Sequence, residues 1–375
     1  MTDKINTLAF ICEGLSYEYG GQAVSIPSLG NALSKKSLQV SYFVTENRTS
    51  RINKIDRSSK IFFCKPYGKK SKLSIELFFK LRRNRNTFDL VHINNLWNFV
   101  PLVSFIFCWL YAKPFVISTR GMAMSAVLQN SFFKNIFFKI ILYPILQKAK
   151  FIHTTSSNEK NNLKKLGITN NIIVSPNGIN NIIKKPDFDK LVKIRQKAKT
   201  ILFVGRICAH KNIDILIRAF AIFLKNKTDW KLSIIGNYDD PKYAKFINNL
   251  IMEENIKKQI NIPGFKTSHD LVEEYEKASF FISSSKSENF GLSIAEALRA
   301  GLPAIVPLDS PWEFISEHNC GYATKPDIFE IANAMTLITT NLTYRKNIFY
   351  NAINYTKNFT WEAQAKKLQE EYSKN

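Results

Sequence analysis

Short apolar runs alternate along the whole chain with longer segments in which apolar residues recur at helical spacing. Such uninterrupted runs are typical of strands that are buried on both faces of a parallel sheet. The predicted strands are residues 5–12, 40–45, 90–94, 114–119, 151–155, 172–175, 201–204, 231–235 and 278–282. The predicted helices are residues 23–34, 73–85, 99–112, 130–150, 158–166, 213–225, 292–300 and 361–372. This alternation predicts an α/β fold with a doubly wound parallel sheet in each half of the chain.

Two domains are expected, because 375 residues exceed the usual length of one. A Lys/Pro-rich stretch at 181–199 predicts the connection between them, and a polar stretch at 50–74 predicts a connection within the first. We therefore place an N-terminal domain at 1–180 and a C-terminal domain at 181–357.

The composition, with 45% hydrophobic residues, is that of a globular protein. The five cysteines form no CxxC pair, so neither a zinc site nor a disulfide framework is indicated. The first ten residues lack the long apolar region and cleavage site of a signal peptide, which favours a cytoplasmic location.

The net charge of +23 is concentrated in the first half of the chain. Residues 1–180 hold 25 Lys and Arg against 8 Asp and Glu, a charge of +17, and the remainder carries +6. Such a basic half can bind nucleic acid or an anionic membrane, but no nucleic-acid-binding module is recognisable. We therefore expect an anionic membrane surface as a partner and no nucleic acid.

The segment 130–150 has two interpretations. It combines Phe132, Phe133, Phe137 and Phe138 with lysines that include Lys134, Lys139 and Lys148. A basic, Phe-rich helix can lie in a membrane interface. It can equally be a core helix whose lysines extend outward to water. The sequence leaves both open.

The stretch from Ser283 to Val306 is the most informative part of the chain. A buried strand, a Ser/Gly-rich loop and a helix N-terminus follow one another there, which favours an anion. Two carboxylates, Glu288 and Glu296, lie in the same place. Carboxylates accept hydrogen bonds from hydroxyl groups and repel phosphates, so a ligand with both phosphates and sugar hydroxyls is indicated: a nucleotide sugar.

The sequence S-E-N-F-G-L-S-I-A-E-A-L-R-A-G-L-P around these two acids resembles the E-x7-E signature of the family-4 retaining glycosyltransferases. The resemblance implies a GT-B fold, with two Rossmann-like domains that face each other across a cleft. It implies that the N-terminal domain binds the acceptor and the C-terminal domain the nucleotide sugar. It also implies that the C-terminal helix, within 358–375, packs back on the first domain.

Other segments are similar to the same family. Gly20-Gly21 is similar to a turn that meets the donor diphosphate, and Pro176-Asn-Gly-Ile179 to the turn that closes the first domain. Phe203-Val-Gly205-Arg206 followed by Lys211-Asn212 is similar to V-G-R-x4-K-[GN]. Arg206 and Lys211 follow a strand, at the sheet edge where α/β proteins bind ligands. Two cations there would stabilise the charge of a departing nucleoside diphosphate.

No metal ion or other cofactor is expected, because these two cations would supply the charge that a metal supplies elsewhere. Asp187-Phe-Asp189 spells a D-x-D pattern of the kind that binds divalent ions in GT-A transferases. It lies in the predicted linker, away from a strand end, so we interpret both carboxylates as solvated.

The resemblance assigns roles within the 283–306 stretch. Glu288 accepts from a hydroxyl of the donor sugar, while Asn289 and the amides of Phe290, Gly291 and Leu292 hold neighbouring groups. Glu296 accepts from the ribose diol. Neither acid is a covalent nucleophile in this scheme, and the leaving phosphate helps to deprotonate the acceptor.

The chain departs from the family in two places. Many members have His where the strand 114–119 ends, and here the residue is Arg120, which cannot serve as a general base. An R-G-M sequence, like Pro311-Trp-Glu313, resembles a subset that builds bacterial surface polysaccharides. Arg120 is therefore a candidate for binding an acceptor phosphate, or a donor carboxylate or hydroxyl. His92 lacks the second His that relatives often have, so we interpret it as a buried strand residue.

The function expected from the resemblance is transfer of a hexose from a UDP- or GDP-sugar. The expected acceptor is a lipid-linked or growing surface glycan, at the cytoplasmic face of the membrane. Alternatives are a soluble synthase of the sucrose or trehalose type, a non-catalytic nucleotide-sugar-binding protein, or a nucleic-acid-binding protein.

Overall fold

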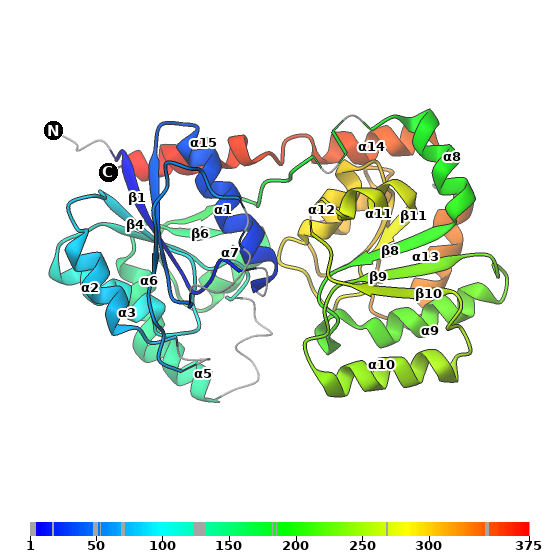
Figure 1. Cartoon of the computed structure of the whole chain (residues 1–375), viewed down its shortest axis with the longest axis horizontal. Helices are drawn as coiled ribbons and strands as arrows, with labels where there is room; N and C mark the ends of the chain where they lie inside the picture. Colours follow the sequence, from blue (N-terminus) through cyan, green and yellow to red (C-terminus); the bar gives the residue numbers. More distant parts are fainter. Residues whose placement is uncertain are drawn as a thin grey trace. The chain divides into compact units, whose positions relative to one another are not determined.

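The computed structural model describes residues 5–16, 19–47, 52, 54–68, 72–123, 132–181, 183–184, 186–267, 269–341 and 345–374 (Figure 1). The chain forms two compact units. Unit 1 comprises Met1–Gly178 with Phe359–Asn375, and unit 2 comprises Ile179–Asn358. The chain therefore passes from one unit to the other twice, within two residues of the predicted boundaries.

Unit 1 is built on a seven-stranded sheet in the order β3-β2-β1-β4-β5-β6-β7, with every pair parallel. The strands are β1 (Thr7–Cys12), β2 (Gln39–Val44), β3 (Ile61–Phe63), β4 (Leu90–Ile93), β5 (Phe115–Ser118), β6 (Ile152–Thr154) and β7 (Ile172–Val174). The order reverses between β1 and β4, which is where a doubly wound sheet opens a crevice at its carboxyl edge.

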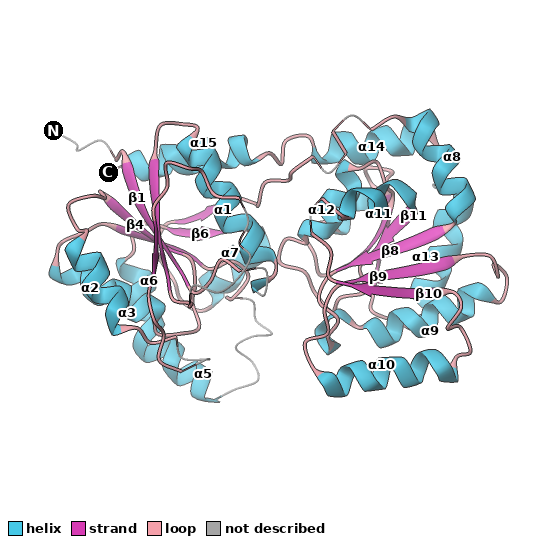
Figure 2. Cartoon of the chain, viewed as in Figure 1, coloured by secondary structure: helices cyan, strands magenta, loops and turns pink. Residues whose placement is uncertain are grey.

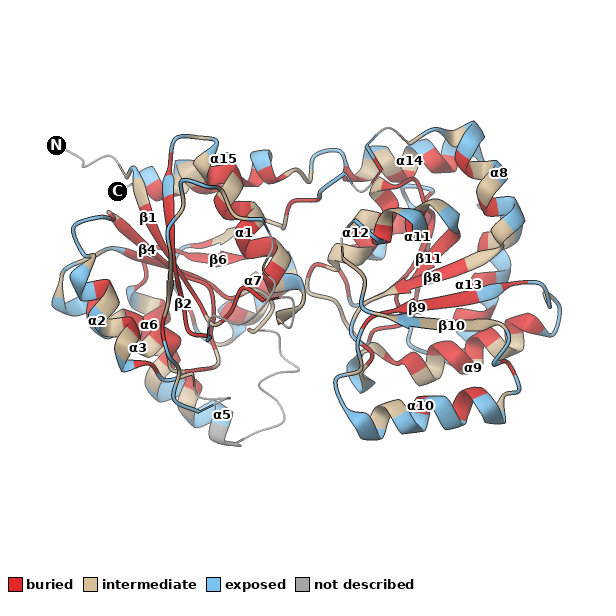
Figure 3. Ribbon diagram, viewed as in Figure 1, coloured by how far each residue is buried: buried red, intermediate tan, exposed pale blue. Residues whose placement is uncertain are grey.

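Helices cover both faces of this sheet (Figure 2). One face carries α1 (Gly21–Ser34) and α15 (Trp361–Ser373), which pack on each other. The other carries α2 (Ile75–Arg83), α3 (Val100–Leu110), α5 (Phe132–Phe137), the π-helical turn η2 (Phe138–Leu142), α6 (Tyr143–Lys148) and α7 (Ser157–Lys165). The strands between the two layers are almost wholly buried, as their uninterrupted apolar runs require (Figure 3).

Unit 2 has a six-stranded parallel sheet in the order β10-β9-β8-β11-β12-β13. The strands are β8 (Thr200–Val204), β9 (Lys231–Ile235), β10 (Ile260–Gly264), β11 (Ala278–Ile282), β12 (Ala304–Pro307) and β13 (Gly321–Thr324). Counted within the unit, this is the 3-2-1-4-5-6 order of a Rossmann fold, with its reversal between β8 and β11.

The helices of unit 2 also form two layers. On one face are α9 (Ile213–Leu224), α10 (Pro241–Glu253) and α13 (Ile328–Asn341). Contacting the other face or its helices are α8 (Phe188–Ala198), α11 (Leu271–Lys277), α12 (Leu292–Arg299) and α14 (Lys346–Thr356). Two short 3-10 helices are η3 (Ala209–Lys211) and η4 (Glu313–Ser316). The two sheets confirm the predicted α/β class with two doubly wound domains.

Two sequence interpretations were wrong. The polar stretch 50–74 contains β3, an edge strand whose three residues are all partly exposed. The predicted linker 181–199 contains α8, which begins after the N-cap Asp187. The helix was not recognised because its sequence is rich in Lys and its buried side is formed by only two residues, Leu191 and Arg195.

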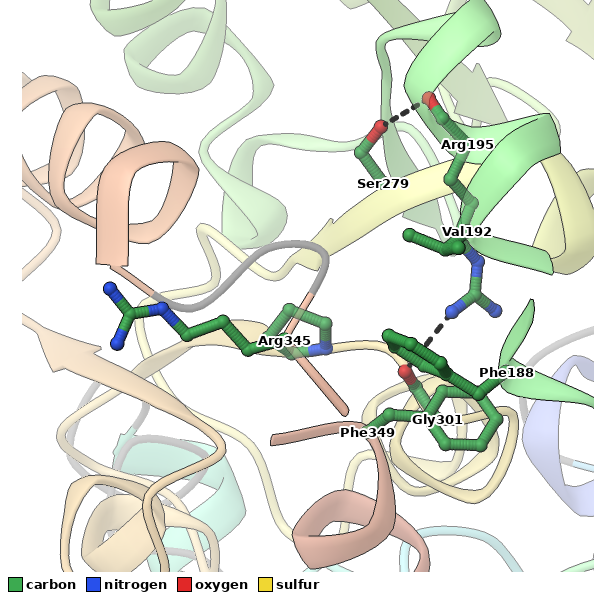
Figure 4. A pocket seen from close by; sticks show the side chains of 8 residues that line it. Phe188, Val192, Arg195, Ser279, Gly301, Arg345 and Phe349 are labelled. Atoms are coloured by element: carbon green, nitrogen blue, oxygen red, sulfur yellow. Dashed lines mark hydrogen bonds between the residues drawn. The ribbon is translucent and has the colours of Figure 1, made fainter. Parts of the chain in front are cut away.

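The buried Arg195 connects α8 to the C-terminal ends of α11 and α12. Its guanidinium donates to the carbonyls of Ala300 and Gly301 at the end of α12, and to that of Tyr275 near the end of α11. Figure 4 shows this group beside Phe188 and Phe349 in a small cavity. Helix ends leave carbonyls without partners, and here one cation satisfies those of two helices. It therefore fixes α12 from its C-terminal end.

The segment 130–150 combines features of both sequence interpretations. Phe138 and Leu142 are buried in the core of unit 1, while Lys134, Lys139 and Lys148 are exposed. The side chains of Phe132 and Phe133 lie outside the described residues. Across the described parts of the chain, none of the helices has the length and apolar character needed to cross a membrane.

Candidate functional site

The loops that follow β8 and β11 meet at the switch point of the unit 2 sheet. The first runs from Gly205 to Asn212 and the second from Ser283 to Gly291. Asn212 donates through its side-chain amide to the Ser284 carbonyl (3.1 Å), and the Ser284 hydroxyl donates to the Lys211 carbonyl (2.8 Å). These reciprocal bonds lock the two loops together and bring Lys211 to Glu288.

Glu288 is held from one side only. Its Oε1 accepts from Lys211 Nζ (2.6 Å), Ser285 Oγ (2.7 Å) and Ser283 Oγ (3.1 Å). Within the described residues no hydrogen bond reaches its Oε2. Since a carboxylate has about four acceptor positions, the second oxygen can still accept from a ligand.

The electrostatics keep Glu288 ionised. Burial opposes ionisation, but the Lys211 ammonium and the Ser285 and Ser283 hydroxyls outweigh it and hold the pKa of Glu288 below its ordinary value. The side chains of Lys211 and Glu288 are only 18% and 13% exposed, so water screens their attraction weakly. The site therefore contains a fixed anion and a fixed cation side by side.

Arg206 forms an ion pair with a residue on the loop after β9. Its Nη1 lies 2.8 Å from Asp239 Oδ2, on the loop after β9, and its side chain is 61% exposed. Arg206 and Lys211 lie on one loop, before and after His210 in the sequence.

The pKa of His210 is lowered, mostly by burial, then by the charge of Lys211 and to a smaller extent by that of Arg206. Gly205 precedes them and donates from its backbone N–H to the Ile235 carbonyl (2.9 Å).

The loop after β11 ends at the N-terminus of α12. Gly291 is the N-cap at φ +73°, a conformation that favours glycine, and Leu292 begins the helix. The first turn of a helix has N–H groups without intrahelical partners. Asn289 is partly exposed, while the ring of Phe290 is buried against Trp312, whose indole N–H donates to the Phe290 carbonyl. Phe290 thus anchors the loop by its ring and carbonyl.

Glu296 lies further along α12 and is paired with a residue that the sequence did not suggest. The hydroxyl of Tyr275, on α11, donates to Glu296 Oε2 (3.2 Å). Burial raises the pKa of Glu296 to about 7, and this hydrogen bond opposes the rise only in part. At neutral pH this carboxyl group is therefore close to half ionised.

The raised pKa of Glu296 should make the free energy of unfolding depend on pH. The folded protein holds the proton up to about pH 7, whereas the unfolded chain releases it near 4.5. Its contribution to the free energy of unfolding therefore falls as pH rises from 4.5 to 7, and is constant outside that window. Across this window the free energy of unfolding of the wild type should fall by about 1–3 kcal/mol because of Glu296, and this fall should be absent in Glu296→Gln. Denaturant titrations at pH 4.5, 6 and 7.5 check this, and a constant difference between variant and wild type would contradict it.

Unit 1 places the other predicted residues at the carboxyl edge of its own sheet. Gly20 is the N-cap of α1 at φ +58°, where a side chain would be strained, and Gly21 is the first helical residue. Arg120 follows β5, and its guanidinium donates to Asn94 Oδ1 (3.0 and 2.8 Å) and to Ser25 Oγ (3.1 Å). Burial lowers the pKa of Arg120 to about 10, so the group stays charged at neutral pH.

His92 is buried, and it belongs to a hydrogen-bond chain across the unit 1 sheet. Its ring nitrogens lie 2.6 Å from the Tyr372 hydroxyl and 2.5 Å from Ser118 Oγ, and the chain continues to His153 (2.5 Å). His153 Nε2 lies 2.8 Å from the Ser175 carbonyl, which can only accept, so this nitrogen must carry the proton. Burial lowers the pKa of both imidazoles and keeps them neutral, so the proton on His153 Nε2 fixes the direction of every bond back to Tyr372 on α15.

The carboxylates of the D-x-D pattern serve α8. Asp187 Oδ1 accepts from the Lys190 backbone N–H (3.2 Å) as the N-cap, and Asp189 lies in the first turn. Over the described ranges, no group of three or more His, Cys, Asp and Glu residues is arranged to hold a metal ion. Independence of a metal stays a prediction.

Comparison with known proteins decides the family. The model described as Glycosyltransferase Family 4 matches residues 19–181, and that described as Glycosyl transferases group 1 matches residues 184–355. Together they span most of both units. This chain belongs to the family-4 glycosyltransferases.

Relatives with a similar sequence and solved structures with a similar fold agree with that assignment. An uncharacterised glycosyltransferase of Methanocaldococcus jannaschii is 28% identical over 258 residues, 66% of this chain and 65% of its own length. A GDP-mannose:cellobiosyl-diphosphopolyprenol alpha-mannosyltransferase of Xanthomonas campestris is 24% identical over 220 residues, 58% of this chain and 55% of its own length. These alignments thus span less than two thirds of each relative.

The structural similarity extends over the whole fold. HepE of Anabaena in complex with UDP-glucose has a TM-score of 0.78 at 16% identity, covering 98% of this chain and 99% of its own. Sucrose-phosphate synthase of Thermosynechococcus elongatus has a TM-score of 0.77 at 20% identity, covering 98% of both chains. At such identities the likeness shows the shared GT-B fold.

Sequence reasoning missed several residues of this glycosyltransferase that the structure places at its site. Ser283 and Ser285 directly follow β11, so their position at a strand end was an available signal. Asp239 follows β9 in the same way. Tyr275 carried no signal, because its contact with Glu296 depends on how α11 packs beside α12.

Proposed function

We propose that this protein is a retaining glycosyltransferase that moves a hexose from a UDP- or GDP-sugar to a lipid-linked or growing surface glycan. The observation that carries the proposal is the arrangement of Glu288. Three donors hold its Oε1, while Oε2 remains available to accept from a hydroxyl of the donor sugar. The E-x7-E spacing places Glu296 on the following helix, where it accepts from the ribose diol.

Lys211 has a double role in this proposal. One of the three N–H donors of its ammonium group binds Glu288, and the others can meet diphosphate oxygens. Arg206 on the same loop adds a planar fork that suits a phosphate. Negative charge on the diphosphate grows as the glycosidic bond breaks, so fixed cations stabilise the transition state more than the ground state. The first amides of α12 support the same group through the helix dipole.

The proposed acceptor side lies in unit 1. Arg120 is held by Asn94 and Ser25 at the carboxyl end of β5 and remains partly exposed. A guanidinium fixed in this way suits a phosphate, such as that of a lipid-linked glycan, or a hydroxyl. The diphosphopolyprenol acceptor in the name of the Xanthomonas relative supports this acceptor class. The likeness to sucrose-phosphate synthase supports the alternative, a soluble sugar acceptor.

A screen of nucleotide sugars by thermal shift tests the donor. A ligand at 100 times its Kd stabilises the folded state by about 2.7 kcal/mol, which is expected to raise Tm by about 5 °C or more. We expect UDP- or GDP-hexoses to do so with and without EDTA. If EDTA removed the shift and magnesium or manganese restored it, Asp187 and Asp189 would be reconsidered as ligands. If no nucleotide sugar shifted Tm, the proposed function would fail.

A further inference from the structure

The outer surface of unit 1 formed by α2, α3, α5 and η2 exposes an unusual number of large apolar side chains. We call it the α2–α3–η2 face. Its members are Ile75 (56% exposed), Phe79 (56%), Ile106 (41%), Trp109 (69%), Leu110 (54%), Ile136 (41%) and Ile140 (70%). Single exposed apolar residues are ordinary, but several on neighbouring helices mark an interaction surface.

These residues form outward stripes at helical spacing. Ile75 and Phe79 are four residues apart, as are Ile136 and Ile140, while Ile106 lies three and four residues before Trp109 and Leu110. The opposite stripes of the same helices fill the core with Leu77, Leu81, Phe107, Cys108, Phe138 and Leu142. Helix α3 contacts both α2 and η2, so the elements that carry these stripes are neighbours. Figure 1 shows α2 and α3 side by side in unit 1. Helices that are apolar on both faces are not explained by the fold of unit 1 alone.

Cations border these stripes. Arg82, Arg83 and Arg85 are exposed at the end of α2, and Lys134 and Lys139 are exposed next to Ile136 and Ile140. Residues 75–85, 100–113 and 132–150 together hold nine Lys and Arg residues against a single acid, Glu76. Lys80 pairs with that acid at 2.7 Å. The face therefore presents apolar side chains within a positive field.

We infer that the α2–α3–η2 face docks on an anionic lipid bilayer, with Trp109, Phe79 and Ile140 inserted among the headgroups. Apolar and cationic side chains on the outside of adjacent helices match the two components of such a surface. A second copy of the chain would bring like charges together across the contact. A nucleic acid would use the cations but would leave Ile140, Leu110 and Ile106 without a partner.

This inference rests on the proposed function, because a lipid-linked acceptor places the enzyme at a membrane. The phenylalanines of the segment 130–150 that the structure describes do not take part in the proposed insertion. Phe138 is 4% exposed and packs in the core, and Phe137 packs against the same cluster, so neither is free to leave it. Trp109, in the helix that the sequence predicts at residues 99–112, is 69% exposed and is available to insert.

Co-sedimentation of the full chain with vesicles tests the inference. The vesicles contain phosphatidylcholine alone or with 30% phosphatidylglycerol, at low and high salt. We expect binding only to the anionic vesicles, and weaker binding at high salt. The double variants Trp109→Ser/Ile140→Ser and Arg82→Glu/Arg83→Glu should each lower the partition coefficient by about tenfold or more.

Matched controls come from unit 2. Phe329→Ser removes an apolar side chain that is 72% exposed, and Lys257→Glu/Lys258→Glu reverses two adjacent exposed cations. Both should bind vesicles like the wild type. Nucleotide-sugar shifts should be unchanged in all four variants, since every replaced side chain is exposed. Arg82→Glu/Arg83→Glu should lower Tm slightly, because it places two negative charges in the last turn of α2.

Three results would overturn the inference. They are no sedimentation with anionic vesicles at low salt, equal losses in the unit 2 controls, and unchanged binding in both α2–α3–η2 variants. Concentration-dependent dimers or salt-sensitive binding to arbitrary DNA that these variants abolish, without vesicle binding, would assign the face to another partner. None of these outcomes would affect nucleotide-sugar binding, so the vesicle experiments test the docking surface separately from the proposed function.

Discussion

Replacing Glu288 with Gln is expected to remove about 2–4 kcal/mol of transition-state stabilisation, a fall in kcat/KM of roughly 30-fold to 1,000-fold. Gln keeps the size of the side chain but loses the negative charge that three donors now hold through Oε1. Its amide also loses one of two acceptor oxygens, and Oε2 is the oxygen proposed to meet the sugar. The rate is measured as release of nucleoside diphosphate from the donor that the thermal-shift screen selects.

Glu317→Gln is the matched control, because Glu317 is exposed next to η4 in the same unit. It should leave kcat/KM unchanged. The loss in the Glu288 variant should appear without a comparable loss of affinity for the free nucleoside diphosphate. If the Glu288 variant had the kcat/KM of the wild type, the proposed contact between Glu288 and the donor sugar would be contradicted.

Replacing Lys211 with Ala is expected to have the second large effect, because it removes a cation from the diphosphate and leaves the Glu288 carboxylate without its ion-pair partner. Nucleoside-diphosphate affinity should fall by roughly tenfold to 100-fold, as for a charge-assisted hydrogen bond worth about 1.5–3 kcal/mol. The free energy of unfolding at pH 7 should fall by about 1–3 kcal/mol, because a buried charge then lacks compensation.

The pH dependence identifies the cause of that instability. In the wild type the pKa of Glu288 is lowered on folding, so its contribution to stability is present above the unfolded value of 4.5 and is lost as pH falls through the folded value. The Lys211 variant should therefore differ from the wild type more at pH 7 than at pH 4. Arg206→Ala removes an exposed pair with Asp239 and should change stability by less than about 1 kcal/mol. A Lys211 variant with equal deficits at both pH values would contradict the pairing.

The fold could be predicted wherever one local signal was sufficient. Buried strands such as β1 and β11 are uninterrupted apolar runs, and α12 has helical spacing and ends before Gly301. β3 was not predicted because its apolar run, Ile61–Phe63, is only three residues long and lies inside a Lys/Arg-rich polar stretch. α8 was not predicted because its helical stripe includes Arg195, a cation that is buried only through the carbonyls of two other helices.

Some features of the candidate site could likewise be predicted from the sequence, and others could not. The spacing of Glu288 and Glu296, and of Arg206 and Lys211, could be read along the chain. The pairing of Lys211 with Glu288 could not, because these residues are 77 positions apart and meet only since β8 and β11 are adjacent. The same applies to Asp239 with Arg206 and to Tyr275 with Glu296. Partners across elements depend on packing, which has no local signature.

The assignment of Glu288 to the donor sugar is tested most directly by calorimetric titration of the wild type and Glu288→Gln. Each protein is titrated with a nucleoside diphosphate and with the matching nucleotide hexose. We expect both proteins to bind the free diphosphate with nearly equal Kd, while only the variant loses the additional affinity that the sugar provides. We also expect Lys211→Ala to weaken the binding of both ligands. Equal loss of diphosphate and nucleotide-hexose binding in Glu288→Gln would contradict the assignment of Glu288 to the sugar.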